Sequence, residues 1–158
     1  MKLRIAGIVD DSIVDGEGVR LTVFTQGCPH HCHGCHNPQT WNLTGGHEID
    51  TEEIVQKLKA NPLLSGITFS GGEPFLQPAP LTELARAAHK LGLDVWSYTG
   101  FTLEELEKRT DVQQLLNEVD VLVDGPYVEA LRDLTLRFRG SSNQRIIDLK
   151  ELRRGRVA

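Results

Sequence analysis

Cysteine is scarce in this sequence, and long apolar runs are absent from it. Three of the 158 residues are cysteines, and all three fall between residues 28 and 35. An odd number of clustered cysteines excludes the disulfide framework of a small secreted protein. No run of 18 apolar residues occurs, and the N-terminus turns acidic too early for a signal peptide. We therefore expect a cytoplasmic protein with no membrane partner.

The chain also lacks the basic excess that is typical of nucleic-acid-binding proteins, because its net charge is −5. The charge is unevenly distributed. Residues 132–158 hold eight Lys or Arg against three Asp or Glu, a net +5 that leaves −10 on residues 1–131. We expect no nucleic-acid partner and a basic C-terminal tail over residues 151–158, whose order the sequence leaves open.

No internal repeat or low-complexity segment is present, and periodicity predicts one domain of alternating strands and helices. An apolar face predicts a helix over residues 81–91, and Thr102 with Glu105 predicts a capping box. Asp50 is expected to cap an earlier helix. The order predicts an α/β fold with a mainly parallel sheet of five or six strands. Strands are predicted at residues 3–9, 19–25, 67–69, 93–98 and 119–123.

Three loops of unusual composition follow predicted strands, after Thr25, Phe69 and Val123. In parallel sheets, ligand sites gather at the carboxyl ends of the strands. We therefore expect these three loops to share one site.

The first loop spaces its cysteines as C-x3-C-x2-C, at Cys28, Cys32 and Cys35. Thiolates bind soft metals, and three of them on a four-iron cube leave one iron open to chelate a substrate. Two alternatives stay open from the loop alone: a structural zinc site completed by a histidine, and three buried thiols without a ligand. The neighbouring histidines are His30, His31, His33 and His36.

A second motif follows the strand predicted at residues 67–69 and reads Ser-Gly-Gly-Glu-Pro over residues 70–74. Its glycines let the backbone approach a ligand closely, and Glu73 offers a carboxylate to an ammonium group. This motif lies about 35–40 residues after the cysteines, and the combination favours the iron–sulfur cluster over zinc.

Together the two motifs resemble those of the radical S-adenosylmethionine superfamily, and the likeness extends over most of the chain. Residues 15–20, read as DGEGVR, and then Gln-Gly-Cys at 26–28 resemble the activating enzymes of glycyl-radical enzymes. The small size, the turn at residues 124–127 and the stretch RFRGSSNQR at 137–145 resemble the activators of anaerobic ribonucleoside-triphosphate reductase.

Three alternative functions remain open at this point. Two are radical enzymes: an activator of another glycyl-radical enzyme, such as pyruvate formate-lyase, and a small enzyme acting on a free metabolite. The third is a zinc-stabilised binding module.

The resemblance implies a radical S-adenosylmethionine core domain over residues 1–150, folded as a partial, open β/α barrel. It implies a [4Fe–4S] cluster on the three cysteines, with S-adenosylmethionine as the second cofactor. It further implies a reduced flavodoxin-type electron donor and, as partner, the large glycyl-radical subunit of anaerobic ribonucleoside-triphosphate reductase.

The same resemblance assigns residues to the cofactor. The amino group of S-adenosylmethionine is expected at Gly71, Gly72 and Glu73. Many superfamily members have an aromatic side chain near the adenine, just before the last cysteine. That position is Gly34 here, so adenine is expected at the backbone of Gly34, Cys35 and His36 instead. Asp124 is expected either to contact the ribose or sulfonium region or to serve its turn alone.

No catalytic acid or base beyond the cluster is expected, because hydrogen-atom abstraction needs none. His30, His31 and His33 are therefore interpreted as polar surface residues of the loop. Arg139, Asn143 and Arg145 are candidates for binding the substrate carboxylate or for docking the partner.

Overall fold

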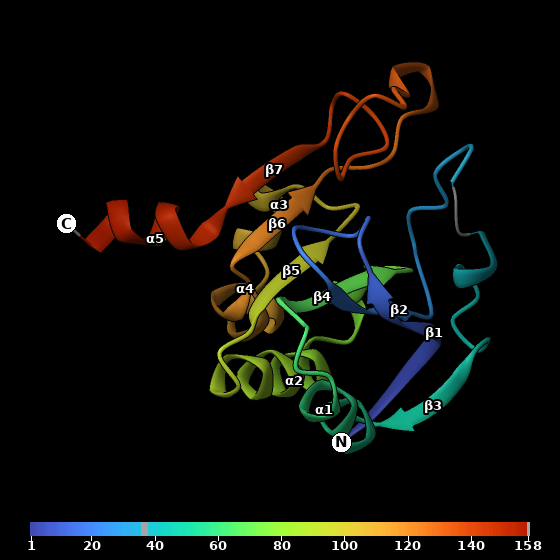
Figure 1. The fold of residues 1–158 in the computed structure, drawn as a ribbon. Helices are drawn as coiled ribbons and strands as arrows, with labels where there is room; N and C mark the ends of the chain where they lie inside the picture. Colours follow the sequence, from blue (N-terminus) through green and yellow to red (C-terminus); the bar gives the residue numbers. More distant parts are fainter. Residues whose placement is uncertain (36–37, 158) are drawn as a thin grey trace.

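One seven-stranded sheet organises the chain, as the computed structural model shows for residues 1–35 and 38–157 (Figure 1). The strand order is β3-β1-β2-β4-β5-β6-β7. The strands are β1 (Lys2–Ser12), β2 (Arg20–Thr25), β3 (His47–Asp50), β4 (Gly66–Gly71), β5 (Asp94–Tyr98), β6 (Val121–Asp124) and β7 (Arg145–Asp148).

The four central strands, β2, β4, β5 and β6, are parallel to one another. Pairing is antiparallel between β3 and β1, between β1 and β2, and between β6 and β7. The sheet ends at β3 and β7 without closing. The prediction of a single α/β domain with an open sheet and a parallel centre is confirmed.

The expected number of five or six strands is wrong, because β3 and β7 were missed. Each is only four residues long, reads HEID or RIID, and has no fully buried residue. Such segments lack the apolar alternation by which strands are recognised in a sequence. They are strands because a neighbouring strand supplies the hydrogen bonds: β1 for β3, and β6 for β7.

The helices are α1 (Thr51–Ala60), α2 (Pro78–Lys90), α3 (Leu103–Glu107), α4 (Gln113–Glu118) and α5 (Leu149–Val157). The predicted capping box is confirmed, since Thr102 and Glu105 exchange side-chain and backbone hydrogen bonds at the start of α3. The Asp50 side chain caps α1 by accepting the backbone N–H of Glu52. Short 3-10 turns lie at Pro38–Thr40, Pro74–Leu76, Thr110–Val112 and Glu129–Leu131.

The helices α1, α2 and α4 pack side by side against one face of the sheet (Figure 1). Side chains alternate along each strand, so Leu21 and Val23 of β2 enter the core beneath these helices. Leu81 and Leu84 of α2 are fully buried there, and each such leucine contributes about 1.5–3 kcal/mol of burial free energy.

The opposite face of the sheet is polar, because Arg20 and Thr68 project from it. Arg20 is fully buried, donates from Nε to Thr68 Oγ1 at 2.7 Å, and lies over the Trp96 ring. A polar inner face under a curved sheet is suited to a polar ligand rather than to further core packing.

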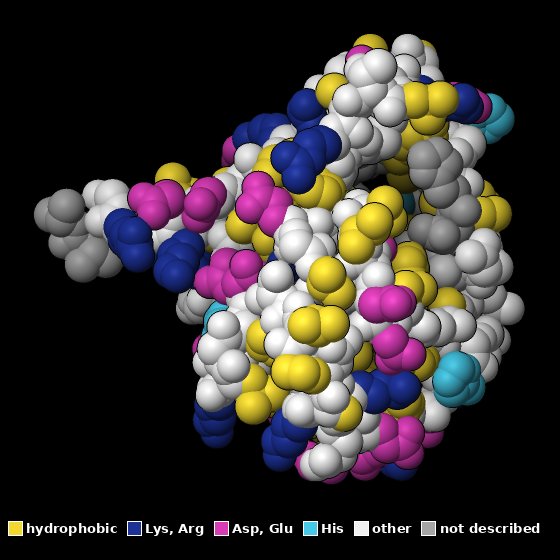
Figure 2. Space-filling model, viewed as in Figure 1, with side chains coloured by type: hydrophobic (Ala, Val, Ile, Leu, Met, Phe, Trp, Pro, Cys, Tyr) yellow, Lys and Arg dark blue, Asp and Glu magenta, His cyan; other side chains and the backbone are white. Residues whose placement is uncertain are grey.

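The segment after β7 begins on the sheet and then leaves it. Leu149 is buried beside β6, and the rest of α5 projects from the body (Figure 1), with Lys and Arg side chains along it (Figure 2). The division into residues 1–150 and a tail at 151–158 stays a prediction. Within the described part of the chain, no helix is long and apolar enough to cross a membrane.

Candidate active site at the carboxyl ends of the parallel strands

A cavity of about 300 Å³ opens at the carboxyl ends of β2, β4, β5 and β6. It brings together the three loops that the sequence places after strands, since their residues share its wall. The late stretch 137–145 also reaches it. The lining includes Cys28, Cys32, Cys35, Gly71, Gly72, Tyr98, Thr99, Gly100, Gly125, Phe138 and Arg139.

All three cysteines line this cavity and are partly exposed. The loop is held to the following segment by two backbone hydrogen bonds: the N–H of Gly27 donates to Thr40 and that of Cys28 to Trp41. Burial raises the pKa of the Cys28 thiol, and the backbone N–H groups of His30 and His31 oppose this increase.

The donors in this wall fit an iron–sulfur cluster held by three thiolates. No disulfide joins any of the three described cysteines, and soft thiolate ligands are what such a cluster needs. Over residues 1–35 and 38–157, no three His, Cys, Asp or Glu side chains are grouped as the ligands of a single metal ion. A four-iron cluster does not need that grouping, because each thiolate binds a different iron. His36 lies outside the described residues, so its predicted role stays a prediction.

Two buried donors in the cavity wall support a polar ligand. In the part of the chain that the structure describes, Trp41 Nε1 and Arg139 Nε are buried and have no hydrogen-bond acceptor. Both residues line the cavity. Buried N–H groups without a partner are rare in folded proteins, and a bound ligand with acceptor oxygens would satisfy them.

Gly71 and Gly72 line the cavity through their backbone. Gly71 has φ of +132°, and a Cβ on either glycine would lie 2.4 Å from a backbone atom of Thr25. The close approach of β2 and β4 therefore requires glycine at both positions.

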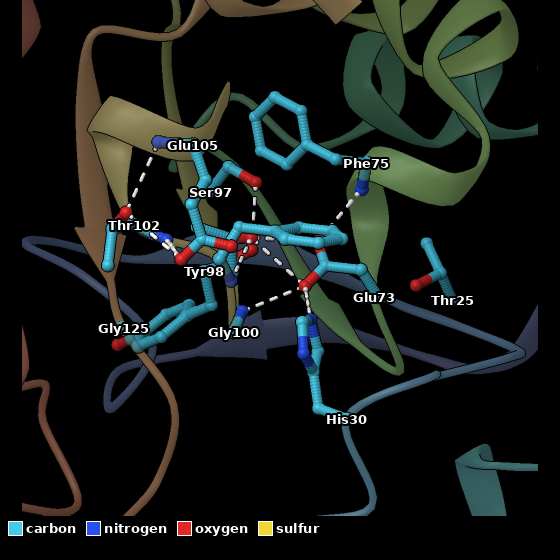
Figure 3. A network of polar contacts seen from close by, with 12 residues as sticks. Thr25, His30, Glu73, Phe75, Ser97, Tyr98, Gly100, Thr102, Glu105 and Gly125 are labelled. Carbon is cyan, nitrogen blue, oxygen red and sulfur yellow. Dashed lines mark hydrogen bonds and ion pairs between the residues drawn. The ribbon is translucent and has the colours of Figure 1, made fainter. Parts of the chain in front are cut away.

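Glu73 follows these glycines in the chain, is fully buried and is not part of the cavity wall. Figure 3 shows its carboxylate directed toward His30 and Gly100. Its Oε1 accepts the backbone N–H of Gly100 at 2.8 Å and lies 2.7 Å from Nε2 of His30. Thr99 Oγ1 is 2.9 Å from both carboxylate oxygens, and Oε2 accepts the N–H of Phe75 at 3.0 Å. Internal donors therefore occupy this carboxylate.

Asp124 is also turned away from the cavity and is 1% exposed. It accepts the N–H of Leu103 at the start of α3 at 2.7 Å and the Nε of Arg145 at 3.0 Å. Arg145 also binds both carboxylate oxygens of Glu104. These two carboxylates raise the pKa of Arg145, and the guanidinium lowers the pKa of Glu104 to about 2.

Arg139 is the one of the three late candidates that lines the cavity. Its Nη1 donates to the backbone oxygen of Gln144, and Asn143 donates to that of Pro126. Gly34 is not in the cavity wall and lies against the side chain of Glu129. Of the predicted adenine residues, Cys35 alone among those described lines the cavity.

The interpretation of the histidines as surface residues is wrong for His30. Its side chain is 16% exposed, lines the cavity and contacts Glu73. His31 stacks on Trp41, whereas His33 is 94% exposed and pairs with Glu129. Nothing in the residue pattern separates His30 from the other two, and Thr99 was missed for the same reason.

Comparison with known proteins identifies the family. Residues 14–147 match the family described as "4Fe-4S single cluster domain". The chain is 40% identical to the anaerobic ribonucleoside-triphosphate reductase-activating protein of Vibrio cholerae, with 84% of this chain and 89% of that protein aligned. The chain belongs to this activating-protein family. An iron–sulfur cluster is therefore the group that its three cysteines are expected to serve.

Two further comparisons show how far the similarity of this activating-protein family member to other proteins extends. The pyruvate formate-lyase-activating enzyme of Clostridium pasteurianum is 41% identical, over 69% of this chain and 50% of that enzyme. The crystal structure of QueE from Escherichia coli superposes with a TM-score of 0.52 at 16% identity, covering 78% of this chain and 70% of that chain. At that identity the match supports the fold alone.

Proposed function

We propose that this protein cleaves S-adenosylmethionine reductively at a [4Fe–4S] cluster and generates a glycyl radical on anaerobic ribonucleoside-triphosphate reductase. One observation carries the proposal: three thiols and the Gly71–Gly72 backbone form the wall of one cavity at the carboxyl ends of the parallel strands. The activating proteins to which the chain is similar support the reductase as the partner.

Cys28, Cys32 and Cys35 would hold the cluster through their thiolates. Bound and reduced by the electron donor, it would supply one electron for cleavage of S-adenosylmethionine to methionine and a 5′-deoxyadenosyl radical, which would take a hydrogen atom from the glycine of the partner and become 5′-deoxyadenosine. The protein's part is to position the reactants and to exclude water from them.

The Gly71–Gly72 backbone would accept the ammonium group of the substrate, because both residues line the cavity and backbone carbonyls are hydrogen-bond acceptors. Glu73 has its oxygens occupied by internal donors, and we infer that it supports this backbone from behind. Arg139 Nε and Trp41 Nε1 are the donors available for the substrate carboxylate. The internal partners of Asp124 favour a structural role over contact with the ribose.

The electron donor would be a reduced flavodoxin-type protein. The glycine-bearing segment of the large reductase subunit would enter from the open side of the sheet, because β3 and β7 do not pair to close a barrel.

Anaerobic reconstitution followed by iron and zinc analysis tests this function. We expect about four irons per chain, absorbance in the iron–sulfur charge-transfer region and 5′-deoxyadenosine on reduction with S-adenosylmethionine. Addition of the reductase subunit should give the doublet of a glycyl radical in electron paramagnetic resonance. Stoichiometric zinc without a cluster would establish a binding module instead.

Activation of a pyruvate formate-lyase is the second candidate, and the Clostridium pasteurianum relative supports it. The two candidates are separated by offering each glycyl-radical enzyme in turn to the same reconstituted protein. A radical on the lyase and none on the reductase would assign the protein to the second.

A further inference from the structure

His30 occupies an unusual place in the cysteine loop, between two of the thiols and in contact with the sheet. Its ring lies edge-on to Phe101, with centroids 4.5 Å apart. Its Nε2 is 2.7 Å from Glu73 Oε1, a contact that Figure 3 shows. An ionised carboxylate only accepts hydrogen bonds, so His30 Nε2 is the donor whenever Glu73 is ionised.

The ring has little room to take another position. A Cβ added at Gly100 would lie 2.4 Å from Cδ2 of His30 and within 2.7 Å of two further ring atoms. Phe101 closes the slot on another side. Gly100 and Phe101, which form this slot, follow β5, and Glu73 follows β4. The His30 side chain therefore connects the cysteine loop to the ends of two strands.

Backbone contacts strengthen the same connection. The N–H of Glu73 donates to the carbonyl of Gly27 at 2.7 Å, just before the first cysteine. Glu73 therefore contacts the loop on both sides of Cys28, through Gly27 and through His30. Glu73 also follows directly on the Gly71–Gly72 backbone.

We propose that His30 is a positioning residue, whose hydrogen bond to Glu73 fixes the segment carrying Cys28 and Cys32 relative to the Gly71–Gly72 backbone. The importance of this position for a cluster rests on the proposed function. The contact itself belongs to the chain without a cluster and can be tested there.

The first experiment measures how fast iodoacetamide alkylates Cys28 in the full-length, metal-free, reduced protein, with the site resolved by tandem mass spectrometry. His30→Ala should raise the rate about tenfold or more, since losing a hydrogen bond to a carboxylate shifts a local opening equilibrium by about that factor. His30→Gln keeps a donor at a similar reach and should restore most of the protection.

His33→Ala is the matched control, because His33 lies in the same loop but is 94% exposed and pairs with Glu129 at the surface. Its alkylation rate should stay within twofold of the parent rate. Circular dichroism melts confirm that each variant folds. A parent-like rate in His30→Ala would overturn the proposal, whether or not the protein binds iron.

A second variant tests the slot without removing the histidine. Gly100→Ala puts a methyl group where the His30 ring lies, and the three nearest atoms that this methyl would meet are all from His30. It should increase Cys28 alkylation in the parent but add little in a His30→Ala background. Additive effects in this double-mutant cycle would mean that Gly100 acts through other residues and would contradict the proposal.

The reconstituted enzyme gives a third measurement. His30→Ala should raise KM for S-adenosylmethionine more than it lowers kcat, because it would displace the cysteine segment relative to the Gly71–Gly72 backbone, and both bind the substrate in the proposed function. An unchanged KM would contradict positioning by His30. A parent protein that binds no iron would instead overturn the proposed function and leave the alkylation result valid.

Discussion

Glu73 and Asp124 are both buried carboxylates at the ends of parallel strands, but their partners differ. Glu73 contacts His30 and the neutral donors Thr99, Gly100 and Phe75. Asp124 contacts a guanidinium, that of Arg145, and one backbone N–H at the start of α3. The first carboxylate joins the cysteine loop to the sheet, and the second joins the last strand to its neighbour.

The difference indicates which side of the cavity carries chemistry. Changes around Glu73 act on the loop that holds the thiols, so they should alter cofactor binding. Changes around Asp124 act on the pairing of β6 with β7 and on α3, so they should alter stability first. Four substitutions test this division.

The largest effect is expected from the loop that Glu73 supports. Cys32→Ser replaces a soft thiolate by a hydroxyl, which is a poor ligand for iron. We expect loss of the cluster absorbance and of S-adenosylmethionine cleavage after reconstitution, with a thermal midpoint in the metal-free state close to that of the parent. Full cluster loading in this variant would remove Cys32 from the ligand set.

Glu73→Gln is expected to have the next largest effect. The amide nitrogen of Gln cannot accept the hydrogen bonds that Thr99 and Gly100 donate to the carboxylate, so at least one buried donor would be left without an acceptor. Loss of outer partners of metal ligands typically costs about 10–100-fold in metal affinity or activity. We expect a decrease of that order in S-adenosylmethionine cleavage, measured as 5′-deoxyadenosine formed. A rate equal to the parent rate would assign Glu73 to folding alone.

Asp124→Asn should lower the stability of the protein and leave its cofactor binding unchanged, unlike the two substitutions above. Asp124 is 1% exposed while the Arg145 side chain is 47% exposed, so water partly compensates the arginine when the carboxylate is lost. We expect about 2 kcal/mol less free energy of unfolding in urea, with iron content unchanged. A lost cluster at parent-like stability would contradict the division between the two sides.

The smallest effect is expected at Glu104, the exposed carboxylate that also binds Arg145. Its pKa is lowered to about 2 by the Arg145 guanidinium, below the value of about 4.3 in an unfolded chain. Its contribution is therefore present above about pH 4.5 and is lost as the pH falls toward 2. The stability of the parent should fall more steeply than that of Glu104→Gln between pH 5 and pH 3, by urea unfolding.

Glu53→Gln, on an exposed position of α1, provides the control for that pH series. It should keep the parental dependence on pH. Equal slopes in the parent and in Glu104→Gln would show that the Arg145 contact has no role in acid stability.

Much of the fold could be read from local pattern. The apolar face of α2, the capping box of Thr102 and Glu105, and the strands with apolar runs depend on residues a few positions apart. The edge strands β3 and β7 could not be recognised, because four residues with only one or two apolar side chains become a strand only when a neighbouring strand is in place. Their absence from the prediction also hid the antiparallel edges of the sheet.

By itself, the sequence determined the parts of the site that depend on spacing: the three thiols, the Gly71–Gly72 turn and their common edge of the sheet. Tertiary structure decided how the carboxylates are used. Glu73 meets His30 across 43 positions and Thr99 across 26, and Asp124 meets Arg145 across 21. Such contacts leave no local periodicity in the chain, because folding alone brings the donor to the acceptor.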